Sequence, residues 1–106
     1  MSIAKLVVSE VVSPGTVRGD DDRLYVLRGV PDVEEGFVHF EAARALVDRF
    51  LGGKELCFDE ETARELSELP GLDIVALDSH GAAVTPTLAV LVAGVLSGHP
   101  LREHAA

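Results

Sequence analysis

The segment from residue 73 to 98 constrains the fold of this chain more than any other. Residues 74–77 are a short apolar run bounded by turn residues, which is typical of a buried strand in a parallel sheet. After a polar loop, Thr85 is a good N-cap and Pro86 a good first residue for a helix. From residue 88 to 96 this helix has no polar side chain, whereas a surface helix carries a polar face. We therefore expect the helix to be covered all round, by a partner or by a central place in the fold.

The length and composition indicate a single domain over residues 1–106. A chain of 106 residues supports one core but not two. Its hydrophobic fraction of 47% favours folding over disorder. The aromatic residues are Tyr25 and four Phe, so the core is expected to be aliphatic. Residues 98–106 are expected to fray.

The chain is strongly acidic. Eighteen Asp and Glu against nine Lys and Arg give a net charge of -9. A field of this sign repels phosphate groups, so nucleic acid and anionic membranes are not expected as partners. The acidic residues concentrate at 20–22, 34–35 and 59–61. The simplest interpretation of these runs is solvated loops and a helix N-terminus, and the alternative is a docking surface for a basic partner.

The chain contains one cysteine, Cys57, so it forms no internal disulfide and no thiolate metal site. A lone cysteine fits a reducing cytosol, and we expect a cytoplasmic protein. Residues 1–12 carry no cleavage signature and indicate a first strand instead of a signal peptide. No apolar run reaches the roughly 18 residues that a membrane span needs.

The hydrophobic pattern predicts strands and helices in the order β-β-α-β-α-β-α. The strands are expected over 3–12, 23–30, 54–58 and 74–77, and the helices over 37–51, 59–69 and 85–98. The alternation of strands and helices predicts an α/β domain with a mixed sheet that includes parallel pairs.

Two of the expected helices have an amphipathic pattern. In the helix over 37–51, Arg44 and Asp48 lie four positions apart on the outer face and can pair, for a few tenths of a kcal/mol. The helix over 59–69 is expected to begin at its N-cap, Asp59. The side chains expected to face inward are Phe40, Ala43, Leu46, Val47, Phe50 and Leu51 in the former and Ala63, Leu66 and Leu69 in the latter.

Few residues present a recognisable chemistry. None of the four histidines stands in a spacing typical of zinc, and the glycines form no phosphate-binding motif, so no metal and no cofactor are expected. Cys57 has acidic neighbours instead of the cationic ones that a reactive thiolate needs. Ser79 and His80 are adjacent, without the G-x-S-x-G turn of a nucleophilic serine. No catalytic residue is therefore expected.

The hydroxyl groups before the apolar helix are the remaining candidates, and they belong to Ser79, Thr85 and Thr87. Thr85 is explained by its expected role as the N-cap. Thr87 lies in the first turn, where a phosphate would meet free N–H groups and the positive end of the helix dipole. The simplest interpretation is that these hydroxyls cap the helix, and the alternative is a phosphorylation switch at Thr87.

Three local patterns between residues 54 and 98 occur together in one known family. A strand ends in LDSHG (77–81), a TPT turn (85–87) opens an apolar helix, and a predicted helix, EETARELSEL (60–69), precedes the strand. In these features the chain resembles STAS domains, the sulfate-transporter and anti-sigma-factor-antagonist domains, and particularly their bacterial STAS-like variant. The resemblance implies a regulatory module without enzymatic activity that binds a protein, such as an anti-sigma-type kinase. It also implies that Thr87, ahead of Thr85, takes the place of the family's phosphorylated hydroxyl.

Three functions from different classes remain open. In the first, the chain is a regulatory module that docks a protein partner through the loop 78–87 and the last helix. The residues expected to contact that partner are Asp78, Ser79, His80, Thr85 and Thr87. In the second, it is a structural subunit of a homo-oligomer such as a homodimer, which buries the apolar helix 86–97 or a sheet edge against another copy. In the third, it is a small ligand-binding protein or enzyme that uses Asp78, Ser79 and His80 in a pocket.

Overall fold

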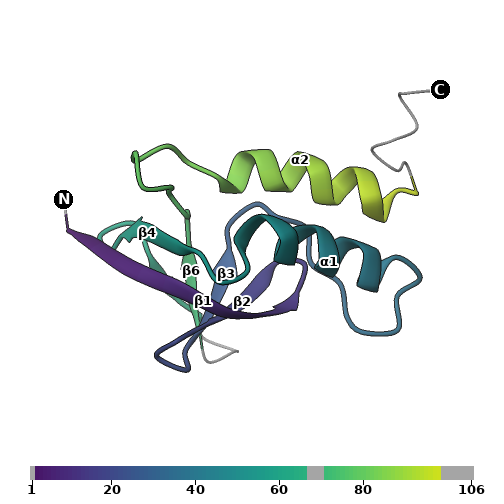
Figure 1. Ribbon diagram of the computed structural model, residues 1–106, viewed down its shortest axis with the longest axis horizontal. Helices are drawn as coiled ribbons and strands as arrows, with labels where there is room; N and C mark the ends of the chain where they lie inside the picture. Colours follow the sequence, from purple (N-terminus) through teal and green to yellow (C-terminus); the bar gives the residue numbers. More distant parts are fainter. Residues whose placement is uncertain (1, 67–70, 99–106) are drawn as a thin grey trace.

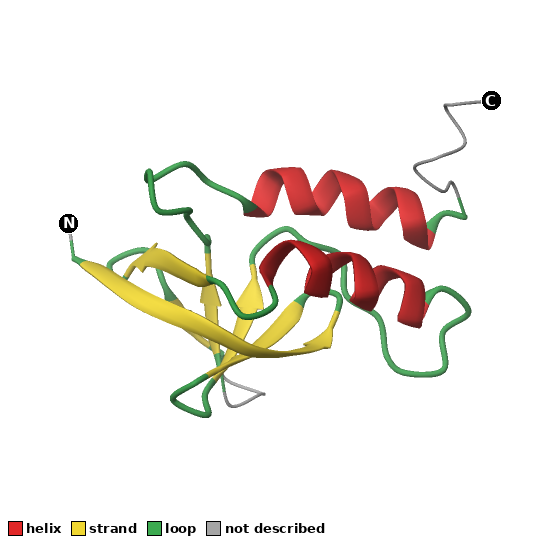
Figure 2. Cartoon of the chain, viewed as in Figure 1, coloured by secondary structure: helices red, strands yellow, loops and turns green. Residues whose placement is uncertain are grey.

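The computed structural model describes residues 2–66 and 71–98. In this part of the chain a curled, mixed sheet carries two helices, which lie side by side on one of its faces (Figure 1, Figure 2). The elements in chain order are β1 (Ile3–Ser13), β2 (Thr16–Gly19), β3 (Leu24–Leu27), α1 (Phe40–Leu51), β4 (Glu55–Asp59), β5 (Arg64–Glu65), β6 (Leu72–Ile74) and α2 (Thr85–Leu96).

Among the described residues, the sheet has six strands in the order β4-β1-β2-β3-β6-β5. The first three strands form an antiparallel meander, β4 adds antiparallel to the free side of β1, and β6 adds parallel to β3. Beyond β6, Leu77 N donates to Cys57 O at 2.8 Å, and Cys57 N donates to Leu77 O at 2.9 Å. This pair of bonds, the Leu77–Cys57 seam, curls the sheet back on itself and pairs the outer edge of β4.

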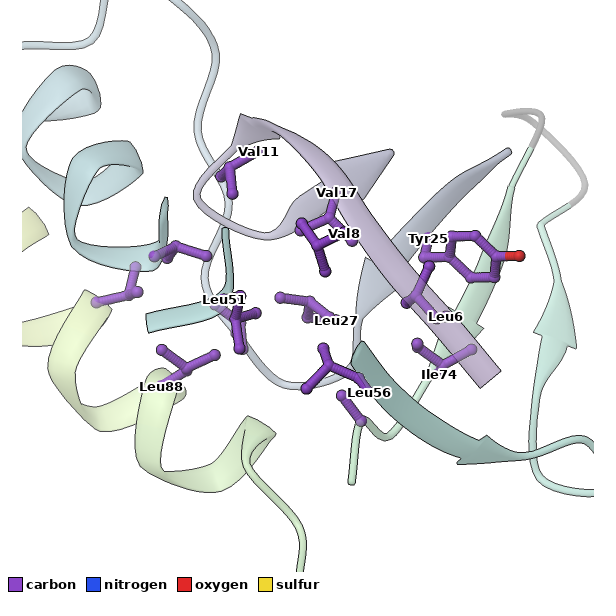
Figure 3. Close-up of a cluster of buried hydrophobic side chains, with 14 of the residues drawn as sticks. Leu6, Val8, Val11, Val17, Tyr25, Leu27, Leu51, Leu56, Ile74 and Leu88 are labelled. Carbon is purple, nitrogen blue, oxygen red and sulfur yellow. The ribbon is translucent and has the colours of Figure 1, made fainter. Parts of the chain in front are cut away.

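The core fills the inside of this curl beneath the two helices (Figure 3). Side chains alternate along β1 with Leu6 and Val8 inside, as expected of a strand with one buried face. Complete burial of an aliphatic side chain of this size contributes about 1.5–3 kcal/mol. The other strands and both helices add Val17, Tyr25, Leu27, Leu51, Leu56, Ile74 and Leu88.

The predicted α/β class, with one domain and a mixed sheet, is confirmed. The strands expected over 3–12, 23–30 and 54–58 correspond to β1, β3 and β4, and the helix expected over 37–51 forms as α1. The strand expected over 74–77 forms earlier, as β6, and only Leu77 of its second half makes a bridge. The predicted order of elements differs in two places. It lacks β2, and it has a helix where β5 forms.

An additional strand, β2, separates the two expected N-terminal strands. The turn at Pro14 and Gly15 is tight enough for Thr16 to pair with Ser13. The sequence shows this turn, but β2 contains one large apolar residue, Val17, which is fully buried. A strand of four residues with one such side chain has no recognisable period, and for this reason it was not predicted.

Over the described residues 59–66, a turn and β5 stand in place of the helix expected over 59–69. The Asp59 side chain accepts a hydrogen bond from Glu61 N at 3.0 Å, and the Asp59 carbonyl accepts one from Thr62 N at 3.1 Å. This single turn does not continue as a helix because Arg64 and Glu65 pair with β6 instead. The expected inward position of Leu69 lies outside the described residues.

Two expectations about α1 are also wrong. Phe50 was expected to face inward, but 41% of its surface is exposed. Arg44 pairs with Glu41, at 3.2 Å between Nη2 and Oε2, and not with Asp48. The Asp48 carboxylate lies instead beside Gly52, where the helix ends.

The C-terminal end of α2 is where the sequence places it. Ser97 Oγ donates to Ala93 O at 2.7 Å, and Gly98 has a φ of 79°, which a glycine adopts freely at a helix end. The fraying expected over residues 98–106 concerns a segment that, apart from Gly98, lies outside the described residues. Within residues 2–66 and 71–98, no helix has the length and apolar character needed to cross a membrane.

Candidate functional site

The loop between Leu77 and α2 is a tight hairpin. Asp78 N donates to Ala82 O at 2.8 Å, and Val84 N donates to Ala76 O at 2.9 Å. Gly81 has a φ of 82°, a conformation that side chains other than glycine's resist. The hairpin therefore fixes the backbone of residues 77–83. It also fixes the position of the first turn of α2, which follows directly.

Asp78 holds the tip of this hairpin together. Its Oδ1 accepts hydrogen bonds from His80 N at 2.8 Å and from Ala82 N at 2.9 Å. The N–H groups of Ala82 and then His80 favour the ionised carboxylate and lower the pKa of Asp78. Asp78 thus serves the loop's own backbone.

The side chains of Ser79 and His80 are exposed, and they are not assembled as a nucleophile and a base. Within the described part of the chain, neither side chain makes a hydrogen bond. The third function, as an enzyme, would need a carboxylate that orients the His80 imidazole. Asp78 does not do this, because its Oδ1 accepts hydrogen bonds from backbone N–H groups.

The start of α2 differs from the prediction. Its N-cap is Val84, with no capping hydrogen bond from a side chain, so Thr85 is not the N-cap. Val84 takes this position because its N–H is held by the hairpin while its carbonyl already accepts a hydrogen bond from Leu88 N at 3.1 Å. Thr85 is 2% exposed and does not present its side chain to a partner, whereas Thr87 is exposed.

A groove of about 620 Å³ opens between the hairpin, the first turns of α2 and the last turn of α1. We call it the hairpin groove. Its apolar lining consists of Phe50, Leu51, Leu56, Ala83, Val84 and Leu88. Its polar lining consists of Lys54, Glu55, Asp78, Ser79, His80 and Thr87. The groove brings together four of the five residues expected to contact a partner, and Thr85 is the exception.

The lining residues that the sequence did not indicate are Phe50, Leu51, Lys54, Glu55 and Leu56. They come from the end of α1 and the start of β4, far from the hairpin along the chain. Phe50 was assigned to the core because it continues the apolar period of α1. The sequence does carry one signal, because the two glycines that follow the helix have no side chain to cover Phe50.

The outer face of α2 is the second unusual feature of this region. Residues 85–98 contain no charged side chain, yet 72% of the Val90 surface is exposed. Within the described chain α1 and the sheet cover one side of α2 only, so a central place in the fold is wrong, and cover by a partner stays a prediction. Val90 lies three positions after Thr87 and shares its face, so the apolar surface continues outward from the hairpin groove.

Among the described residues, no three His, Cys, Asp or Glu side chains lie together in an arrangement that could hold a metal ion. Cys57 is a free, half-buried thiol. No family model, no curated protein and no solved structure matches this chain. The STAS-like relationship therefore stays a prediction, and one of its three patterns fails, because described residues 60–66 do not form a helix.

Proposed function

We propose that this protein is a non-enzymatic regulatory module that binds a protein partner through the hairpin groove and the outer face of α2. The observation that carries the proposal is the exposure of Val90 on a helix that has no charged side chain. Covering apolar surface of this kind contributes about 25 cal/mol per Å². The STAS-like resemblance around residues 77–87 supports the same class of function.

The extent of the apolar surface favours a protein over a small molecule. The groove ends on α2 at Thr87 and Leu88, and exposed Val90 and Ala93 follow along the helix. The rise of a helix places Ala93 about 9 Å beyond Thr87. A ligand that fills only the groove would leave this part of α2 in water, whereas a partner helix or strand covers both.

The binding surface is also held in place before a partner arrives. The hairpin is fixed by its backbone bonds and by Asp78, and α2 packs on α1. A surface that needs no ordering loses less conformational entropy when it binds. Moderate affinity is therefore attainable with a small apolar contact.

Thr87 is our proposed site of control within this surface. It is exposed, lines the groove and lies in the first turn of α2. A phosphate there gains from the helix dipole and shares the groove with both Lys54 and Glu55. It also places charge in an apolar contact, so we expect it to release the partner. Thr87→Asp should release a captured partner, whereas Thr87→Val should retain it.

Site-specific photo-crosslinking in the protein's own cells tests the proposal. Benzoylphenylalanine replaces Thr87 in the full chain, and the matched control places it at Glu65, which is exposed on β5. We expect a discrete crosslinked protein from position 87 that position 65 does not give and that Phe50→Asp reduces. Equal labelling from both positions, or none from position 87, would contradict the proposal.

A homo-oligomer that buries α2 is the second candidate, and the same exposed Val90 favours it. Two copies that each carry a net charge of -9 repel one another, so contact is least unfavourable where the surface has no charge. Light scattering after size exclusion over a range of concentrations separates the candidates. A dimer at every concentration favours the structural subunit, and a monomer favours the regulatory module.

A further inference from the structure

A second groove lies at the other end of α1, beside the segment that enters this helix. It encloses about 540 Å³, and its lining consists of Val12, Ser13, Asp32, Val33, Glu34, Glu35 and Phe40. We call it the acidic groove. Phe40 begins α1 and Phe50 lies near its end, so the helix separates the acidic groove from the hairpin groove by about 15 Å.

The acidic groove has an apolar floor and a rim of one charge sign. Val12, Val33 and Phe40 provide the apolar side chains, while three carboxylates and no basic side chain line the groove. Glu34 and Glu35 are exposed, and neither makes an ion pair within the described residues. Because no described basic side chain pairs with Glu34 or Glu35, the carboxylates of the groove attract a cation.

The segment around the groove exposes further apolar surface. Phe37 is 48% exposed and Val38 is 81% exposed, and both lie between Glu35 and Phe40. Large exposed side chains are typical of an interaction site when they gather in one place, and these two precede the lining residue Phe40 by three and two positions. The surface therefore offers a partner both apolar contact and negative charge.

Asp32 makes this surface rigid. Its carboxylate accepts hydrogen bonds from Ser13 Oγ at 3.0 Å, Thr16 Oγ1 at 2.9 Å, Gly15 N at 3.0 Å and Val33 N at 3.0 Å. These bonds tie the segment that carries Glu34 and Glu35 to the turn between β1 and β2. The two glutamates are thus presented from a fixed backbone, which lowers the entropy lost on binding.

We infer that the acidic groove binds a basic segment of a protein partner, with one or two apolar side chains on the floor and flanking Lys or Arg side chains at Glu34 and Glu35. Charge complementarity selects this occupant. Nucleic acid and anionic lipid carry the wrong sign, and a second copy of this chain adds another net charge of -9. This site is independent of the function proposed for the hairpin groove.

A synthetic peptide tests the inference. A labelled peptide of sequence Lys-Lys-Leu-Phe-Lys-Lys is titrated with the full chain, and binding is measured by fluorescence anisotropy. Two control peptides replace either the four lysines with glutamate or the Leu-Phe pair with Ser-Ser. We expect binding of the first peptide only, and binding should weaken at high salt because exposed charges are screened.

Charge-removing variants locate the site. Glu34→Gln with Glu35→Gln should weaken peptide binding by about three- to tenfold, since two exposed ion pairs are lost. The matched control, Asp20→Asn with Glu65→Gln, removes the same charge from exposed positions elsewhere and should change binding less than about twofold. Phe50→Asp, in the hairpin groove, should leave it unchanged, so the two sites can fail separately.

The inference is overturned if the wild-type protein does not bind the peptide, or if the Ser-Ser peptide binds as well. It is also overturned if the control pair of substitutions weakens binding as much as the pair at Glu34 and Glu35. Amide chemical shifts on peptide addition give an independent location. Changes centred on Val12, Val33 and Phe40 support the inference, and changes centred elsewhere refute it.

Discussion

The two helices have the same length and lie side by side on one face of the sheet, but their solvent-exposed sides differ in chemistry. α1 buries five side chains of its apolar stripe and presents charged residues such as Glu41 and Arg49 on its other side. α2 buries only Thr85, Leu88 and Val92, and its outer side has Val90 where α1 has charges. α1 is therefore complete as a surface helix, whereas α2 has a second apolar side that residues 2–66 and 71–98 leave uncovered.

The largest expected effect concerns the inner side of α2. Leu88 is 2% exposed and contacts the core, so Leu88→Ala removes buried methyl groups and leaves a cavity. We expect the free energy of unfolding to fall by about 2–5 kcal/mol, measured by urea denaturation. A loss below about 1 kcal/mol would mean that α2 is loosely attached and would weaken the comparison with α1.

The second effect concerns the segments that lead into the helices, each of which is held by one aspartate. Asp32, before α1, accepts four hydrogen bonds, whereas Asp78, before α2, accepts two from its own loop. Asp32→Ala should lower the free energy of unfolding by about 1–2 kcal/mol and should cost more than Asp78→Ala. If urea denaturation showed a larger loss for Asp78→Ala than for Asp32→Ala, the hairpin would contribute more to stability than the segment before α1.

The third effect is a pH dependence that belongs to the approach to α2. The N–H groups of Ala82 and His80 hold the pKa of Asp78 below its ordinary value of 3.8. The stabilisation is therefore complete above about pH 4 and is lost as the pH falls through the lowered pKa of the folded state. Thermal unfolding between pH 2 and 5 should show a shallower acid slope for Asp78→Asn, and an unchanged slope would contradict the role given to this carboxylate.

The smallest effect on stability is expected on the outer side of α2. Val90→Lys should change the free energy of unfolding by less than about 0.5 kcal/mol, because the side chain is already in water. The same substitution should remove crosslinking from position 87 or any self-association. The matched control is Asp48→Asn on the outer side of α1, which should alter neither the stability nor the crosslinking or self-association. A large loss of stability in Val90→Lys would mean that the outer side of α2 is packed.

The sequence predicts the parts of this fold that depend on local periodicity. The apolar stripe of α1 and the alternation of β1 are local patterns, and both elements form close to where they were expected. The prediction fails where contacts between segments that are distant in the sequence determine the local structure. Arg64 and Glu65 become a strand because β6 lies beside them, and Val84 replaces Thr85 as N-cap because Ala76 holds its N–H.

The candidate site follows the same rule. The hairpin side of the groove, from Asp78 to Thr87, was predicted because its residues are consecutive. The opposite side, with Phe50 and Lys54, arises only when the end of α1 is brought to α2, and no periodicity in the sequence encodes that contact. Phe50 shows the limit most clearly, since its position in the apolar stripe predicts burial and its position in the fold leaves it exposed.

The Leu77–Cys57 seam also protects the protein against unwanted assembly. If these two bonds opened, β4 would offer a bare strand edge to any other extended chain, which is the usual start of sheet-to-sheet aggregation. Each bond contributes only about 0.5–1.5 kcal/mol, so the seam opens far more readily than the whole domain unfolds. We therefore expect the amides of Leu77 and Cys57 to exchange with solvent before global unfolding, and the partner proposed for the neighbouring hairpin groove would slow this exchange.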